Sequence, residues 1–300
     1  MRKNMMKIKL GISPIAWTND DLPELGGGNT FEQCVSEMAL AGFAGCEIGN
    51  KFPKDPEVLR HYLTLRGLSV CNAWYSTFFA AGRADETLAG FVRHRDFLYA
   101  MGAGVIGCSE QSFSIQGLNR TIFGDKPIFN DAQWRLVHDG YKRLSELAAQ
   151  RDMRVCMHHH MGTGVQTADE IAAFMRGAGP DVFLLFDTGH IYCSEWRQDA
   201  VDSVIDTYVD RVAHVHLKDV RREVFEEAKA KSRSFLESVR RGLFTVPGDG
   251  AISFGHTFKA LDAAGYEGWL VVEAEQDPAA ANPFEYALRA RKFIKESIGV

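Results

Sequence analysis

Short apolar runs alternate along the chain with longer segments in which apolar residues recur at helical spacing. Eight of the short runs have the length and composition of buried strands. The helical segments between them include residues 30–43 and 131–152, the second of which opens on Asp131 as a predicted N-cap. Strand and helix repeated eight times predict an α/β fold, a parallel sheet closed into a (β/α)8 TIM barrel. The predicted strands are residues 8–17, 45–49, 68–74, 103–109, 154–159, 182–187, 211–217 and 269–275.

The length of 300 residues fits either two domains or one barrel. We predict a single barrel domain over residues 1–300, because the alternation runs from end to end. A doubly wound sheet would need a glycine-rich phosphate loop after an early strand. The only candidate, LGGGNT at 25–30, lacks the G-x-G-x-x-G spacing and follows a polar segment. We interpret it as a loop that ends in an N-cap at Asn29 or Thr30.

The longest stretch without a predicted strand lies between residues 217 and 269. It contains a charged helical segment at 222–242 and the loop TVPGDGAISF at 245–254. We predict a helical insertion after strand seven, on the face where barrels carry their active sites. The arginines between 221 and 241 either close over a substrate or form a solvated face.

The amino-acid composition limits which binding partners and which cellular compartment we expect. The hydrophobic content of 46% is ordinary for a globular protein with a large core, and the net charge of -5 argues against a nucleic-acid partner. The six cysteines include no C-x-x-C pair, which is typical of reduced thiols in a cytoplasm. Because we find no long apolar run and no signal-peptide pattern, we expect neither export nor a membrane.

Candidate chemistry lies at the ends of the last four predicted strands, where active-site residues of a barrel are expected. Asp187 follows His158 by 29 residues and His216 follows Asp187 by 29, about one strand-helix unit each. The equal spacing predicts that these side chains lie at equivalent positions on neighbouring strands of the barrel. The polar residues at these four strand ends are His158 and His160, then Asp187 and His190, then His214, His216, Lys218 and Asp219, and finally Glu273 and Glu275.

Four inward imidazole and carboxylate side chains suit a divalent ion such as Mn, Co, Zn or Fe, which could bind the carbonyl and hydroxyl oxygens of a substrate. Each residue alone has a simpler explanation: a hydrogen-bonded core histidine, a cap for Asp187, or an arginine pair for Glu273. All four together favour a metal site, because unpaired polar groups inside a barrel cost several kcal/mol.

Sequence motifs carry a resemblance to a known family. The segments DTGH and HVHLKD, with the glutamate of strand eight, resemble the xylose isomerase-like barrel superfamily of sugar isomerases, epimerases and apurinic endonucleases. The segments GISPIAWTNDDLPELGG, GFAGCEIGNKFP, HHHMGTGVQT, DTGHIY and TVPGDGAISF resemble the inosose dehydratase (2-keto-myo-inositol dehydratase) family more closely. This likeness covers nearly the whole chain.

The resemblance implies a ligand set and a metal. Carried over by position, the ligands are an acidic residue on strand five, Asp187, His216 and Glu273. The sequence departs from that pattern, since His158 stands where most relatives have Glu. We take His158 as the ligand, with His160 as its rival, and an imidazole in place of a carboxylate would make the ion more Lewis-acidic. The metal implied is Mn²⁺ or Co²⁺.

Glutathione is also associated with the family's activity. No glutathione site can be read from the sequence, so any role is a hypothesis in which a thiol keeps Cys71, Cys108 or Cys193 reduced.

The implied reaction converts 2-keto-myo-inositol (scyllo-inosose) to 3,5/4-trihydroxycyclohexane-1,2-dione and water, in myo-inositol catabolism. It needs a base for the proton next to the ketone and an acid for the departing hydroxide. We predict catalytic roles for Glu47, His190 and Lys218. Glu47 ends strand two and is the first candidate for proton transfer or substrate orientation, although it could instead cap a loop. Lys218 could equally form a local ion pair with Asp219.

For substrate binding we predict His160, Glu275, Asn50, Lys51 and Trp74, which begins an aromatic cluster with Tyr75, Phe78 and Phe79 that could equally be core packing. The alternative function is a ketose or inosose epimerase or isomerase that uses the same metal and enediolate. An apurinic endonuclease fits poorly, because its further ligands are absent after strand seven. A non-catalytic sugar-binding protein would be expected to lose a ligand. We expect a small cyclic polyol ketone as substrate and a homo-oligomer.

Overall fold

The computed structural model describes residues 7–300 and forms a barrel of parallel strands. The sheet order is β3-β2-β1-β11-β8-β7-β6-β5-β4, and every neighbouring pair is parallel. The first and last strands of that order follow each other in the chain, separated only by residues 73–74, so the sheet closes on itself. The strands are β1 (Ile8–Ile12), β2 (Gly45–Glu47), β3 (Ser69–Asn72), β4 (Tyr75–Thr77), β5 (Val105–Glu110), β6 (Arg154–His158), β7 (Val182–Asp187), β8 (Val212–Leu217) and β11 (Gly268–Val272).

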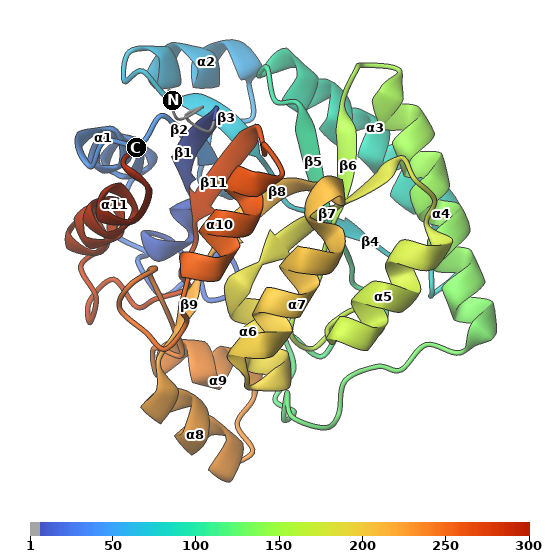
Figure 1. Ribbon diagram of the computed structural model, residues 1–300. Coiled ribbons are helices and arrows are strands. Elements are labelled where there is room, and N and C mark those ends of the chain that lie inside the picture. The colour runs from blue at the N-terminus through green and yellow to red at the C-terminus, as the bar shows by residue number, and fades with distance from the viewer. Residues whose placement is uncertain (1–6) are drawn as a thin grey trace.

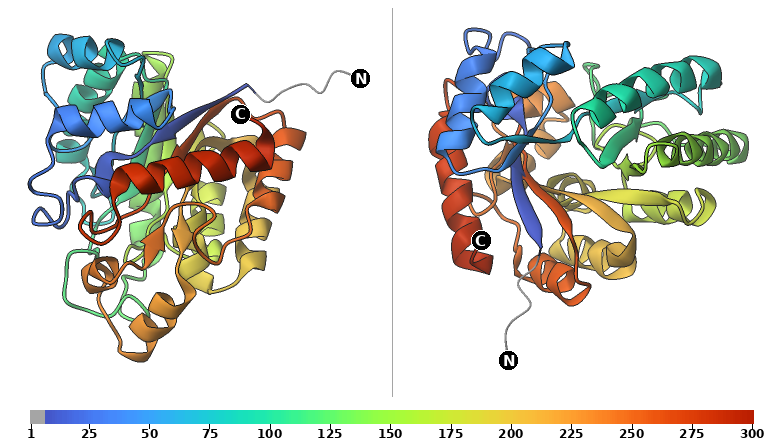
Figure 2. Two further views of the ribbon diagram at one scale, coloured as in Figure 1. Left: turned by 90° about the vertical axis from the view of Figure 1, so that its left-hand side faces the viewer. Right: turned by 90° about the horizontal axis from the view of Figure 1, so that it is seen from above.

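The helices lie around the outside of the strands (Figure 1), as the view from above also shows (Figure 2). The TIM barrel prediction is therefore confirmed; the third predicted strand, residues 68–74, contains β3, and β4 follows it outside the predicted range. The helices that follow the barrel strands are α1 (Phe31–Leu40), α2 (Pro56–Thr64), α3 (Ala84–Ala100), α4 (Asp131–Ala149), α5 (Ala168–Gly177), α6 (Thr188–Glu195), α7 (Gln198–Tyr208), α10 (Gly255–Ala263) and α11 (Pro283–Ile298); the short 3-10 turns are η1 (Pro14–Ala16) and η2 (Val209–Arg211).

Polar caps fix where several helices begin. The Thr30 hydroxyl accepts a hydrogen bond from the backbone N–H of Gln33 and starts α1, which decides between the two predicted caps. The predicted N-cap at Asp131 is wrong by one residue, because Asn130 accepts from the backbone of Gln133 and Asp131 is already helical. Residues 130 and 131 are hard to distinguish in sequence, because an acidic residue is favourable both as an N-cap and in the first helical turn.

The inside of the barrel changes from apolar to polar toward the carboxyl ends of the strands. Val105, Cys156, Leu185 and Ala213 form a buried apolar cluster inside it. Because side chains alternate along a strand, the inward positions two residues after Cys156 and Leu185 are His158 and Asp187. The apolar cluster therefore supports a polar layer directly above it.

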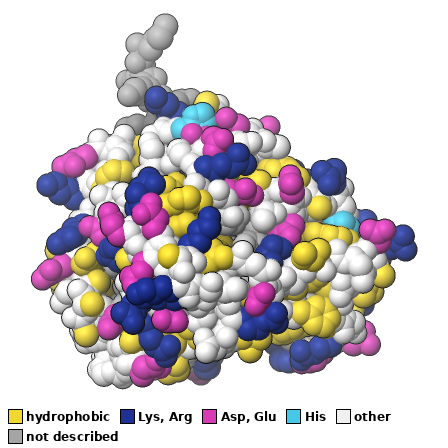
Figure 3. Space-filling model, turned by 90° about the horizontal axis from the view of Figure 1, so that it is seen from below, with side chains coloured by type: hydrophobic (Ala, Val, Ile, Leu, Met, Phe, Trp, Pro, Cys, Tyr) yellow, Lys and Arg dark blue, Asp and Glu magenta, His cyan; other side chains and the backbone are white. Residues whose placement is uncertain are grey.

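Two helices and a small sheet follow the seventh barrel strand. They are α8 (Arg222–Ala230) and α9 (Phe235–Arg240), with β9 (Asp219–Val220) antiparallel to β10 (Phe244–Thr245). Both helices lie at the lower end of the molecule (Figure 1). Seen from below, positive and negative side chains are interspersed, so this face shows no single-sign patch (Figure 3). Among residues 7–300, no helix combines the length and the apolar character that crossing a membrane requires.

Candidate metal centre and active site

A cavity of about 540 Å³ opens at the carboxyl ends of the strands. Residues from the ends of β2, β3, β6 and β8 and from the segment after β11 reach it, as barrel architecture predicts. The predicted site residues that line it are Glu47, Asn50, Trp74, His158, His160, His216, Glu273 and Glu275.

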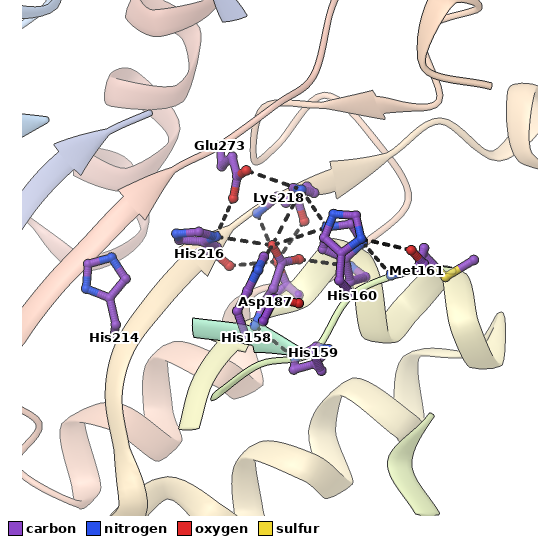
Figure 4. Close-up of polar contacts among 12 residues, drawn as sticks. His158, His159, His160, Met161, Asp187, His214, His216, Lys218 and Glu273 are labelled. Atoms are coloured by element: carbon purple, nitrogen blue, oxygen red, sulfur yellow. Dashed lines mark hydrogen bonds and ion pairs between the residues drawn. The ribbon is translucent and has the colours of Figure 1, made fainter. Parts of the chain in front are cut away.

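Four of these strand-end positions converge. One ligand atom each of His158, Asp187, His216 and Glu273 lies within 4.8 Å of the others, and all four residues are buried. Asp187 pairs in register with His216, as the spacing predicted, whereas His158 pairs with Leu185, two residues before Asp187, so the first of the two equal steps is not a register match. Asp187 Oδ2 lies 3.5 Å from His158 Nε2 and 3.4 Å from His216 Nδ1. Figure 4 shows Asp187 at the centre of this group, with His216 and Glu273 on one side of it.

The donor atoms of this cluster fit a metal ion. Within residues 7–300, His216 Nδ1 and Glu273 Oε2 are buried and have no hydrogen-bond partner, and they contact each other as an ion pair. Burial lowers the pKa of His216, but Glu273 and Glu47 outweigh burial and hold it well above its usual value. Two carboxylates and two imidazoles form the mixed oxygen and nitrogen set that divalent transition ions accept. In the metal-free chain a proton on His216 offsets part of the negative charge of the surrounding carboxylates, which a bound ion would otherwise neutralise.

Asp187 has two functions that the sequence presented as alternatives. Its Oδ1 accepts the backbone N–H of His190 at 2.8 Å and caps α6, while Oδ2 faces the cluster. His159 supports it from behind, because the backbone N–H of Asp187 donates to His159 Nε2 at 3.2 Å. Burial raises the pKa of Asp187, but the Lys218 ammonium and the nearby histidines outweigh burial and hold it well below the usual range.

A buried ammonium lies beside the four-residue cluster. Lys218 Nζ donates to Glu275 Oε1 at 2.9 Å and lies 2.9 Å from His190 Nε2. It is also 3.6 Å from both Asp187 and Glu273. Burial lowers the pKa of Lys218, but the three carboxylates raise it above the usual lysine value, so the side chain is cationic. Lys218 and His190 are thus adjacent.

Glu275 differs from the other carboxylates in its protonation. Burial raises the pKa of Glu275 to about 7, despite the neighbouring ammonium of Lys218. Its Oε2 is buried, and in the described part of the chain it has no hydrogen-bond partner. The local pair of Lys218 with Asp219 does not form. The carboxylate of Asp219 instead accepts the backbone N–H groups of Val220, Gly248, Gly250 and Ile252.

Glu47 points toward the histidines of β8 rather than capping a loop. Its Oε1 lies 3.0 Å from His216 Nε2 and 3.1 Å from His214 Nε2, and it accepts from Asn72 Nδ2 at 2.9 Å. Burial raises the pKa of Glu47, but the two histidines outweigh burial and hold it well below its usual value. His214, away from the other labelled side chains in Figure 4, therefore belongs to the Glu47 group.

The structure separates the two rival histidines of strand five. His158 belongs to the four-residue cluster, whereas His160 lies with His190 and Glu275. The His160 ring packs against the His190 ring, with centroids 3.8 Å apart, and its Nδ1 lies 2.8 Å from the carbonyl of Met161. Burial lowers the pKa of His160 well below its usual value, so the ring is neutral.

The remaining predicted substrate residues lie at the mouth of the cavity or outside it. Trp74 is 41% exposed and presents its ring to His158 and His160, with centroids 5.2 and 5.5 Å away. Asn50 also lines the cavity. The structure does not bring Lys51 there, because its ammonium donates to the carbonyls of Gly26, Gly27 and Asn29. A long, flexible side chain on a loop can reach in several directions. Here the Lys51 ammonium stabilises the loop before α1 through these three hydrogen bonds.

Only part of the aromatic cluster faces the cavity. Phe78 lines it together with Trp74. Phe79 is buried against Tyr141, and Tyr75 packs against Phe91, so these two rings are core packing.

Sequence reasoning missed most of the cavity wall that the first four predicted strands supply. Asp21 and Gln116 meet across it, with Gln116 Nε2 donating to Asp21 Oδ2 at 2.7 Å. Reading the residues that follow the first and fourth predicted strands, as was done for the last four, would have found them. Among residues 7–300, no Lys or Arg lines the cavity. The missed polar residues are Ser13, Asp20, Asp21, Asn72, Ser76, Gln111, Ser114 and Gln116.

The three cysteines considered for glutathione lie away from this surface. Cys71, Cys108 and Cys193 are all buried as free thiols. Burial raises the pKa of each thiol well above its usual value. A thiol held neutral and out of solvent is a poor partner for exchange, and a role for glutathione stays a hypothesis.

Comparison with known proteins places this geometry in a family. Residues 35–297 match the family model described as xylose isomerase-like TIM barrel. The chain is 60% identical over 293 residues to an inosose dehydratase of Glaesserella parasuis, with 98% of each chain covered. It is 58% identical over 297 residues to an inosose dehydratase of Yersinia enterocolitica, covering 99% of this chain and 100% of that one.

A solved structure supports the fold independently. The crystal structure of the IolI protein with a bound zinc atom superposes with a TM-score of 0.70 over 97% of this chain and 98% of that one, at 14% sequence identity. At that identity the likeness concerns the fold alone. The identity to the curated relatives extends over nearly the full length of both chains. The chain therefore belongs to the xylose isomerase-like TIM barrel family and, within it, to the inosose dehydratases, which are hydro-lyases.

Proposed function

We propose that this chain dehydrates 2-keto-myo-inositol (scyllo-inosose) to 3,5/4-trihydroxycyclohexane-1,2-dione, in the catabolism of myo-inositol, and that it uses a divalent metal ion. The observation that carries the proposal is the position of the metal-type cluster directly beside the buried Lys218, Glu275 and His190 group. The names of the relatives supply the substrate, and the adjacent groups supply the two kinds of chemistry that dehydration needs.

The reaction is an elimination without oxidation or reduction. A proton leaves the carbon next to the ketone, and the C–O bond to the hydroxyl on the following carbon breaks. The proton and hydroxide together make the water that is lost, and the resulting enol becomes the second ketone by moving a proton. The enzyme must therefore lower the barrier to deprotonation of one weakly acidic C–H group, and it must protonate one leaving hydroxyl group.

We propose His158, Asp187, His216 and Glu273 as the side chains that hold the ion, with Mn²⁺ or Co²⁺ as the metal. A divalent ion at this position supplies Lewis-acid polarisation of the ketone oxygen and the neighbouring hydroxyl. The set contains no cysteine, and the related fold of IolI holds zinc. All four residues are buried, so the chain keeps bulk water away from the oxygens that develop charge.

Proton transfer is assigned to the Lys218 group. Glu275 lines the cavity, and its Oε2 is free to take or give a proton, at a pKa of about 7 set by burial. The Lys218 ammonium orients Glu275 through Oε1; because Lys218 does not line the cavity, it acts on the substrate through Glu275. His190, 2.9 Å from Lys218 Nζ, holds the ammonium on its other side. This assignment makes Glu275 a catalytic residue rather than only a substrate contact.

The remaining cavity wall fits a neutral polyol. Carboxylate and amide groups of Asp20, Asp21, Asn50, Gln111 and Gln116 can pair with ring hydroxyls, whereas phosphate or carboxylate groups would meet acidic side chains. Trp74 offers an apolar face to the ring. We also place the enzyme in the cytoplasm, since all six cysteines are free and buried.

The test is a metal-dependent turnover assay. Purified enzyme is stripped with a chelator, reloaded with Mn²⁺ or Co²⁺ and incubated with scyllo-inosose in D₂O, while ultraviolet absorbance and proton NMR follow the ring. We expect metal-dependent dione formation that Asp187→Asn and Glu273→Gln abolish in folded protein. Deuterium exchange or inversion at the α-carbon without water loss would refute the dehydratase and establish the epimerase alternative.

A further inference from the structure

The residue predicted to transfer the proton, Glu47, instead lies behind a proposed metal ligand. It ends β2, and its Oε1 meets His216 Nε2 at 3.0 Å across the barrel. His214 Nε2 and Asn72 Nδ2 approach the same oxygen at 3.1 and 2.9 Å. Three nitrogen groups from two strands, β3 and β8, thus point at one carboxylate oxygen, which is a fixed arrangement rather than a free base.

The contact determines which nitrogen of His216 faces the metal cluster. A neutral imidazole has one N–H donor and one lone pair. Because Glu47 accepts from Nε2, the proton stays there when the ring is neutral, and the lone pair available to an ion is on Nδ1. Nδ1 is the atom that faces Asp187 and Glu273, 3.4 Å from Asp187 Oδ2. Carboxylates that accept from the distal nitrogen of a ligand histidine fix its tautomer and ring orientation and make it a better donor.

We propose that Glu47 is a positioning residue: with His214 and Asn72 it holds His216 in the Nε2–H form, so that Nδ1 is presented to the ion. The inference rests on the metal site of the proposed function. It assigns Glu47 to metal affinity and removes it from the proton-transfer step, which is left to the Lys218 group.

A second ion is the rival explanation of the same residues. Glu47, His214 and His216 also offer atoms within 4.8 Å of one another. The distances of 2.9 to 3.1 Å around Glu47 Oε1 are those of hydrogen bonds, and they pair both histidines without an ion. We therefore expect one ion per chain at saturation, and two ions bound in the wild type but one in Glu47→Gln would overturn the proposal.

The experiment compares Glu47→Gln with Glu47→Leu. The Gln side chain keeps an acceptor oxygen for His216, and Leu removes it. Metal dissociation constants are measured by competition with a chelating dye, and kcat is measured at saturating metal. We expect affinity to fall by about 10-fold in Gln and about 100-fold in Leu, while kcat at saturating metal recovers to within about threefold. Loss of kcat in both variants even at saturating metal would show that Glu47 transfers the proton.

Glu110→Gln is the matched control. Glu110 is a buried carboxylate at the end of β5 that accepts from Thr77 Oγ1 and from the backbone of Phe79 and Ala80, away from the histidines. We expect its substitution to change stability but not metal affinity. An equal loss of affinity in Glu110→Gln and Glu47→Gln would show a general loss of structure and overturn the positioning role.

Nitrogen NMR gives a readout that does not depend on turnover. In protein labelled with ¹⁵N-histidine, the Nε2–H proton of His216 is assigned by its loss in His216→Gln. We expect a slowly exchanging signal in the wild type, a weaker one in Glu47→Gln and none in Glu47→Leu. If the wild type fails to dehydrate inosose but shows this order and binds metal, the proposed function falls and the positioning role stands. An unchanged signal in Glu47→Leu would refute the positioning role alone.

Discussion

Three consecutive histidines have three different environments, which depend on where each residue lies relative to the end of β6. His158 faces the metal-type cluster, His160 turns into the loop after β6 and packs on His190, and His159 points to the opposite side. Alternation along a strand predicts the separation of His158 from His159. It does not predict the position of His160, because β6 ends at His158 and the backbone no longer alternates.

The pH dependence of stability should report on His159. Burial lowers the pKa of His159 to about 3, against an ordinary value of 6.5. The neutral form is favoured in the fold, so its contribution is fully present above pH 6.5 and is lost as the pH falls toward 3. In His159→Gln, whose amide oxygen can still accept from Asp187, the unfolding free energy should fall less steeply between pH 6 and 4, by up to about 1.4 kcal/mol per pH unit. Urea unfolding at each pH measures both slopes, and identical slopes would contradict the assignment.

Two lysines that the sequence placed in the site, Lys218 as catalytic and Lys51 as substrate-binding, should differ in their effect on catalysis. Lys218 is buried among Asp187, Glu273 and Glu275, whereas Lys51 donates to loop carbonyls outside the cavity. We expect Lys218→Met to lower kcat by about 10²- to 10⁴-fold, the usual range for a lost proton-transfer group. Lys51→Met should stay within about threefold, as surface substitutions usually do. Steady-state kinetics on folded, metal-loaded protein checks both, and equal losses would return Lys51 to the site.

Much of the candidate site can be predicted at the level of residues, and the missing part has a physical cause. Equal spacing in sequence brings Asp187 and His216 into register because adjacent parallel strands repeat with each strand-helix unit. Contacts across the barrel follow no such spacing. Glu47 lies 169 residues from His216, so its pairing with that histidine could not be inferred from the chain. The direction of Lys51 could not be inferred either, because loop backbone determines it.

At the scale of elements, one carboxylate, that of Asp219, accepts three backbone N–H groups of the loop TVPGDGAISF. Asp219 accepts the backbone N–H of Val220 at 2.8 Å, of Gly248 at 3.1 Å, and of Gly250 and Ile252 at 2.9 Å. Gly248 has a φ of +90°, and a Cβ at Gly250 would lie 2.4 Å from Asp219 Oδ1, so both glycines are required for this close approach. The sequence placed this segment on the active-site face of the barrel. It did not indicate that the Asp219 side chain binds the backbone of the segment.

Asp219→Asn should loosen this loop while the barrel stays folded. The amide replaces one acceptor oxygen by a donor that faces backbone N–H groups, and each unpaired buried group costs about 1–3 kcal/mol. We expect hydrogen exchange across residues 246–252 to accelerate by about 10- to 100-fold, with the central strands unchanged. Asp249→Asn is the control, because Asp249 pairs with Arg221 and Thr245 on the outer side of the loop. Equal acceleration in both variants would contradict the special role of Asp219.

The elements themselves could be predicted where burial dictates the pattern. All eight apolar runs contain a barrel strand, since strands buried on both faces are continuous in hydrophobicity. The strand β4, which follows the third run, and the two-residue strands β9 and β10 were not predicted. Such short pieces bury too few side chains to leave a periodic signal, and tertiary pairing defines them.

At the scale of the whole molecule, a metal ion would link distant parts of the chain. The four proposed ligands come from β6, β7, β8 and the residue after β11, and they converge only when these four neighbouring strands have paired. The unfolded chain offers no such cluster, so an ion that binds the fold stabilises it by about 2.7 kcal/mol at a hundredfold excess over the dissociation constant. We therefore expect Mn²⁺ or Co²⁺ to raise the Tm of chelator-stripped protein by about 5 to 10 °C. Asp187→Asn should abolish this shift in calorimetry, whereas Lys51→Met should keep it. A Tm that is the same with chelator and with excess metal would show that the cluster holds no ion, and with it the Lewis-acid part of the proposed dehydration would fail.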